Sequence, residues 1–69
     1  MERAEIKTPN CMLIGYVETD SSGNKTVRDR NMMILGYYEK NRDATMDNYR
    51  RIIAYGDVTG VFFSSKIQY

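Results

Sequence analysis

Three tyrosines recur along the chain, each followed two residues later by an acid, and these are the side chains best suited to chemistry. The pairs are Tyr16 with Glu18, Tyr37 with Glu39, and Tyr55 with Asp57. In a symmetric arrangement the three rings could line a small-molecule site, and the three acids could converge on a cation. Repeated tyrosines more often belong to a core or an interface, with the hydroxyl reaching a polar partner. The sequence therefore gives Tyr16, Tyr37 and Tyr55 as candidate ligand-binding residues and leaves a structural interpretation open.

The chain lacks the side chains that most enzymes use as nucleophile, base or metal ligand. It has no histidine and a single cysteine, Cys11. An ordinary zinc site, Cys-His or Ser-His catalysis and an internal disulfide are therefore excluded. Acid–base work would fall to carboxylates, lysines or tyrosines, and these recur in threes, whereas a catalytic residue is usually unique in its chain. We expect a protein that is not an enzyme and has no cofactor, no catalytic residue and no metal site.

Charge and hydropathy indicate whether the protein could bind nucleic acid or a membrane. Ten basic residues against nine acidic ones give a net charge of +1, which is not typical of a dedicated DNA-binding protein. Arginines interleaved with tyrosines occur on single-strand nucleic-acid platforms, and here they are Arg28, Arg30, Arg42, Arg50 and Arg51 with Tyr38 and Tyr49. Acids lie among them, so the pattern favours a solvated face with cross-strand ion pairs. No stretch approaches the roughly 18 apolar residues of a membrane span. We expect a cytoplasmic protein that binds neither nucleic acid nor membrane.

The tyrosines belong to an internal repeat, which indicates the elements that position them. Residues 14–16 read Ile-Gly-Tyr, residues 35–37 read Leu-Gly-Tyr, and residues 53–55 read Ile-Ala-Tyr. Repetition at about 20 residues usually decides the whole architecture. We divide a single domain, residues 1–69, into copies at about 5–18, 26–39 and 44–57, with a partial fourth copy at 61–69.

Each copy alternates apolar and polar residues with period two, which indicates strands. Turn signals at Pro9-Asn10, Arg30-Asn31 and Asn48-Tyr49 divide each copy into two strands, and polar loops separate the copies. The predicted fold is all-β, an antiparallel hairpin-repeat meander of about seven or eight short strands with pseudo-symmetry. Glycine weakens a strand interior, so Gly15 and Gly36 mark a bend or a place where another strand or a ring comes close.

A second interpretation applies to residues 43–55. Met46, Tyr49 and Ile52 also fall at helical spacing, with Asp43 available as an N-cap and Gly56 as a C-terminal stop. If this segment is helical, the fold becomes α+β. The gapless match to residues 27–39 favours strands.

A family resemblance rests on the pattern Asp29, Asn31, an apolar pair, Gly36-Tyr37 and Glu39. This pattern resembles the bacterial proteins called four-fold β-flower, over about residues 6–63. The resemblance implies β-hairpin units around a central pseudo-symmetry axis and no established activity. The chain departs from the family where a glycine tends to follow the turn asparagine, since Cys11, Met32 and Arg50 or Tyr49 stand there instead.

These observations lead to two functional hypotheses. The first is a non-catalytic structural or protein-interaction module that self-associates, because sheet edges at residues 4–7 and 67–69 would be exposed in a monomer. The second is a small-ligand-binding module with its site at the pseudo-axis, lined by the repeated tyrosines. The sequence does not identify the ligand or partner, the oligomer number or the biological process.

Overall fold

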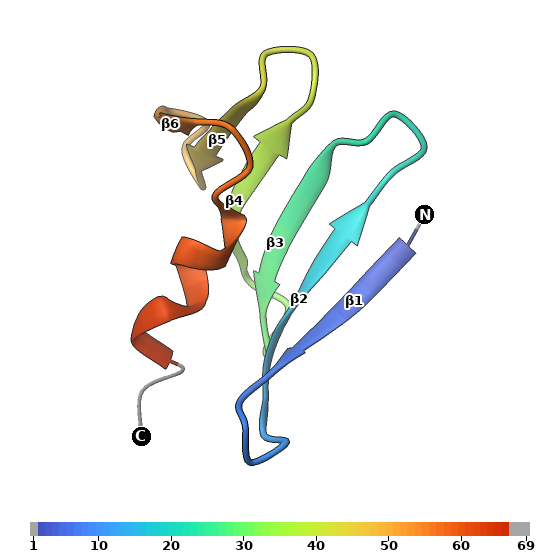
Figure 1. The fold of residues 1–69 in the computed structure, drawn as a ribbon, viewed down its shortest axis with the longest axis vertical. Helices are drawn as coiled ribbons and strands as arrows, with labels where there is room; N and C mark the ends of the chain where they lie inside the picture. The colour runs from blue at the N-terminus through green and yellow to red at the C-terminus, as the bar shows by residue number, and fades with distance from the viewer. Residues whose placement is uncertain (1, 67–69) are drawn as a thin grey trace.

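The fold is a single antiparallel meander followed by a short helix (Figure 1). A computed structural model describes the backbone of residues 2–66 and the side chains as far as Phe63. The strands are β1 (Glu2–Lys7), β2 (Leu13–Thr19), β3 (Lys25–Asp29), β4 (Ile34–Glu39), β5 (Ala44–Asp47) and β6 (Ile52–Tyr55). They pair in sequence order, so β1 and β6 are the two edges of the described sheet. A 3-10 helix, η1 (Thr59–Lys66), follows β6.

The five connections share one kind of turn, in which the last loop residue has a positive φ or is glycine. At all five the amide of this residue donates to the carbonyl three positions earlier: Cys11 to Thr8, Gly23 to Asp20, Met32 to Asp29, Asp43 to Lys40, and Arg50 to Asp47. Three-residue hairpin loops typically combine such a turn with one left-handed residue. The left-handed positions are Cys11, Gly23, Met32, Asp43 and Arg50. The turns therefore lie where the sequence predicted, but the positive φ falls one or two residues after Asn10, Asn31 and Asn48.

In three of the turns, the side chain of the aspartate at the start of the turn stabilises it through hydrogen bonds to backbone amides. Asp29 Oδ1 accepts hydrogen bonds from the amides of Asn31 and Met33 at 2.8 and 3.0 Å. Asp20 and Asp47 each accept the same pair of bonds, from the residues two and four positions later. An aspartate side chain that captures the amide two residues on favours a turn over a continued strand.

One irregularity recurs in hairpins β1–β2, β3–β4 and β5–β6. In each, the second strand carries an extra residue, so the register shifts next to Ile6, Val27 and Thr45. The unpaired residues are Ile14, Leu35 and Ile53. A bulge bends its strand and redirects a side chain. Ile14 consequently joins the core with Val27 and Phe63, and simple alternation along β2 does not hold at this point.

The core lies between the sheet and η1. Val27 and Phe63 are buried, and Ile6, Val17, Leu35 and Phe62 pack around them. A Cβ added at Gly15 would come within 2.4 Å of the Phe63 ring, and one added at Gly36 within 2.3 Å of the Phe62 ring. The two strand glycines therefore make room for two rings, as the sequence suggested, and the rings come from the C-terminal helix.

Two expectations from the sequence are wrong, and a third falls partly outside the described residues. Residues 43–55 are not helical, because they form β5, a tight turn and β6. Residues 61–63, expected as the first strand of a fourth copy, lie in η1, because their two phenylalanines occupy the spaces above Gly15 and Gly36. The described residues form six strands, and the expected strand and sheet edge at residues 67–69 lie outside them. Among residues 2–66, no helix is both long and apolar enough to cross a membrane.

Candidate functional site

The three repeated tyrosines lie on one face of the sheet, on alternate strands. Tyr16 pairs with Arg28 of β3, and Tyr37 pairs with Thr26, two residues away on the same strand. In the same way Tyr37 pairs with Met46 of β5, and Tyr55 pairs with Ala44. Residues that are paired, or two apart in a strand, share a face. Because one strand separates each tyrosine from the next, the strands that carry neighbouring tyrosines are about 10 Å apart.

Two of these rings are covered by arginines of the same chain. The Arg50 guanidinium lies 4.1 Å from the centre of the Tyr37 ring, and that of Arg3 lies 5.3 Å from the Tyr16 ring. These are cation–π distances. The Tyr55 side chain instead is 74% exposed, at the sheet edge. The tyrosines thus differ in environment, and they do not form one shared aromatic ring.

Glu18 is the most enclosed acid of the candidate set and has two arginine partners. It is 9% exposed. Arg3 of β1 donates to Oε2 from Nη2 at 2.6 Å and from Nε at 3.0 Å, and Arg28 of β3 donates to Oε1 at 2.8 Å. The hydrogen bonds from Arg28 and then from Arg3 hold the pKa of Glu18 below its usual value, although partial burial opposes this shift. Glu18 therefore clamps three strands together.

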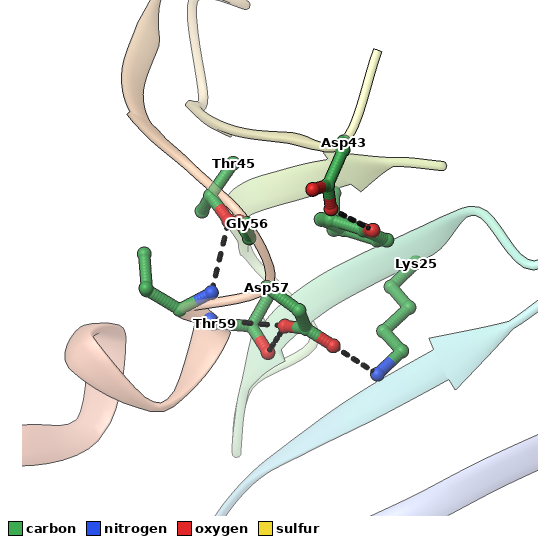
Figure 2. A network of polar contacts seen from close by, with 8 residues as sticks. Lys25, Asp43, Thr45, Gly56, Asp57 and Thr59 are labelled. Carbon is green, nitrogen blue, oxygen red and sulfur yellow. Dashed lines mark hydrogen bonds and ion pairs between the residues drawn. The ribbon is translucent and has the colours of Figure 1, made fainter. Parts of the chain in front are cut away.

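Asp57 has a different role, which Figure 2 shows. Its carboxylate accepts hydrogen bonds from Lys25 Nζ and from Thr59 Oγ1, the latter at 2.8 Å. Burial by itself would raise the pKa of Asp57, but the bonds from Lys25 and Thr59 outweigh it and keep the pKa below its usual value. Asp57 thus fixes the start of η1 against β3.

The buried hydroxyl of Thr45 completes this anchor. It donates to the carbonyl of Gly56 at 2.7 Å and accepts from the amide of Val58 at 3.1 Å (Figure 2). The Gly56 amide in turn donates to the carbonyl of Asp43 at 2.6 Å. The chain that leaves β6 is therefore held, through Gly56 and Val58, to Asp43 and to Thr45 of β5.

The three acids do not meet. Glu39 forms its own ion pair, with Arg42 at 3.1 Å, while Glu18 and Asp57 are held by other cations. No group of three or more potential metal-ligating side chains occurs among the described residues. The arrangement is one of separate local ion pairs, in which most of the arginines singled out from the sequence have a carboxylate or ring partner.

A shallow cavity of about 190 Å³ lies beside Tyr37. Thr26, Met46, Arg50 and Glu39 line it as well, but Tyr16 and Tyr55 do not. Of the three candidate ligand-binding residues, the structure places Tyr37 alone in this cavity.

Sequence reasoning missed the most unusual surface, the outer edge of β6. Ile52, Ile53 and Tyr55 are 42%, 49% and 74% exposed there, and no charged residue interrupts the strand. We call Ile52–Tyr55 the β6 edge. The apolar run was visible in the sequence, but its place at the edge depends on residues 61–63 being helical. In comparisons with known proteins, no family model, curated protein or solved structure matches the chain.

Proposed function

We propose that this chain is a non-catalytic structural or protein-interaction module that associates with copies of itself. The observation that carries the proposal is the exposed, uncharged β6 edge. An apolar edge strand presents unpaired N–H and C=O groups and readily accepts another strand. The other edge differs, because β1 carries charged residues at Glu2, Arg3, Glu5 and Lys7. Charged residues are a common means of protecting a sheet edge.

We further propose that hairpins β1–β2, β3–β4 and β5–β6 are copies of one unit related by pseudo-symmetry. The bulge at the same position of each hairpin supports this, since the pairs β2–β3 and β4–β5 have no register shift. It also agrees with the resemblance to four-fold β-flower proteins. A unit built for stacking against copies of itself serves packing and multivalent contact.

A small-ligand site at the repeated tyrosines is the second candidate, and the cavity beside Tyr37 is the observation in its favour. It is the weaker candidate for two reasons. Tyr16 and Tyr55 lie outside that cavity, and Arg50 already covers the Tyr37 ring.

Light scattering on a size-exclusion column, over a range of protein concentrations, tests the first proposal. We expect a molar mass that is a multiple of 8.0 kDa and that falls on dilution according to mass action. A mass of 8.0 kDa throughout the range would contradict self-association and favour a pocket or a different partner.

A further inference from the structure

The β6 edge has a charge pattern that indicates which strand it accepts. Ile52–Tyr55 carries no charge, but Arg50 and Arg51 precede it and Asp57 follows it. The Arg50 guanidinium, however, lies over the Tyr37 ring of β4, and the Asp57 carboxylate is bonded to Lys25 of β3, so both side chains are turned away from the β6 edge. Arg51 is the flanking charge that remains near the edge, because its side chain is 74% exposed although it is also bonded to Asp47 of β5.

We propose that two copies of the chain pair through their β6 edges in antiparallel fashion, which joins two six-stranded sheets into one continuous sheet. This inference rests on the proposed self-association and names its interface. Antiparallel pairing of identical strands places the start of each beside the end of the other. Uncharged residues of one copy then lie beside uncharged residues of the second copy along the whole of Ile52–Tyr55. A two-fold arrangement of this kind closes after two copies.

The other way to join two sheets uses the β6 edge of one copy and β1 of the next. Continuing the meander requires antiparallel pairing, since every strand pair in the sheet is antiparallel. The exposed Arg51 would then lie toward Lys7, and the uncharged strand would face the charged residues of β1. Like charges opposite each other destabilise a strand pair. Such a contact would also leave a free β6 edge at the end of every assembly and would not close.

The side chains of the β6 edge also suit a copy of the same strand. Ile52, Ile53 and Tyr55 are β-branched or aromatic, and such residues form the more stable cross-strand pairs. The pairing would cover these exposed side chains with their own counterparts. The partner edge would have no charge to desolvate within the strand.

Ile53→Lys tests the interface, since Ile53 is half exposed and an edge lysine opposes strand pairing without disturbing the core. We expect the dissociation constant of the dimer to rise at least tenfold. Met33→Lys is the matched control, because Met33 is 65% exposed but lies on an interior hairpin, and it should leave the constant unchanged. Circular dichroism checks that both variants are folded.

Cysteine cross-linking gives a second readout that does not depend on the lysine variant folding. In a Cys11→Asn background, Ile53→Cys lies near the centre of the paired strands and should form a disulfide-linked dimer on mild oxidation, whereas Met33→Cys should not. Cross-linking of Ile53→Cys only when mixed with Glu5→Cys would mean head-to-tail pairing and would overturn the inference. An oligomer unaffected by Ile53→Lys would also overturn it, while leaving self-association intact. A wild-type monomer at all concentrations would remove the proposed function itself.

Discussion

Residues in left-handed conformation are a source of strain in the hairpin turns. Met32 has a φ of 69°, and Cys11 and Arg50 have values of 65° and 64° at the equivalent positions. This conformation disfavours residues with a Cβ and suits glycine. The turns therefore place residues with a Cβ in a conformation that is unfavourable for them.

Met32→Gly should raise the free energy of unfolding by roughly 0.5–1 kcal/mol, because relief of the left-handed strain exceeds the added entropy of the unfolded chain. Urea unfolding measures this. Arg50→Gly is the informative comparison, since it relieves the same strain but removes the guanidinium from the Tyr37 ring, worth about 0.5–1 kcal/mol at an exposed site. Its net effect should be near zero. An equal gain in both variants would contradict a stabilising role for the stacked arginine.

At this scale the sequence located the turns but not their conformation. Pro9-Asn10 and Arg30-Asn31 do lie in turns. A two-residue hairpin loop would place the positive φ within the pair, whereas a three-residue loop places it on the following residue. Loop length depends on where the strands stop pairing, which the local residues do not specify. The candidate tyrosines have the same limitation, because their equivalence in sequence does not predict that Arg50 covers one ring and Arg3 another.

Between elements, Glu18 joins the first three strands through Arg3 and Arg28. Because the pKa of Glu18 is lowered in the folded state, its ionised form stabilises the fold above the unfolded value of about 4.5. This contribution is lost as the pH falls below 4.5 and the folded-state carboxylate becomes protonated. Asp47 and Asp57 also have lowered pKa values and add to the same trend.

Glu18→Gln should therefore lower stability at pH 7 by about 1 kcal/mol, through the loss of charge-assisted hydrogen bonds. It should also weaken the pH dependence between pH 5 and pH 3, without abolishing it. Urea midpoints measured across this range test both statements. Glu39→Gln is the control at pH 7, because the Glu39–Arg42 pair lies at the surface and should contribute little. An unchanged pH profile in Glu18→Gln would show that the clamp is not the origin of acid sensitivity.

The strands were the part of the fold most accessible to prediction, since the period-two pattern occurs in several copies. The helical alternative for residues 43–55 failed for a local reason. Asp47 Oδ1 accepts bonds from the amides of Tyr49 and Arg51, and these close a turn in the middle of the segment. The apparent helical spacing of Met46, Tyr49 and Ile52 therefore spans a turn and parts of two different strands.

For the molecule as a whole, the C-terminal helix decides which edge of the sheet is left open. Residues 61–63 have the composition of a strand, but in the helix the Phe62 and Phe63 rings fill the spaces above Gly36 and Gly15. Packing two aromatic side chains against the sheet stabilises the fold more than adding a short edge strand would, because aromatic rings contribute much of the stability of a core. The glycines and the phenylalanines could each be identified in the sequence. The contact between them could not be predicted, because these residues lie far apart in the chain.

Phe63→Ala tests whether this contact maintains the fold. Phe63 is 1% exposed, and truncation of a buried phenylalanine typically costs about 3–5 kcal/mol. A domain of 69 residues has a total stability of roughly 3–10 kcal/mol. The variant should therefore be largely unfolded or lose most of its stability, as measured by urea unfolding or thermal melting.

Two further variants test whether the loss of stability in Phe63→Ala comes from the missing Phe63 ring. Phe63→Leu keeps most of the buried volume and should cost less than about 1.5 kcal/mol if the space above Gly15 can adjust. Val61→Ala lies on the same helix but at a half-exposed position, so it should change stability by less than about 0.5 kcal/mol. If Phe63→Ala were as mild as Val61→Ala, η1 would not be anchored on the sheet. Residues 61–63 would then be free to pair beside β6, and the open edge that carries the proposed association would disappear with them.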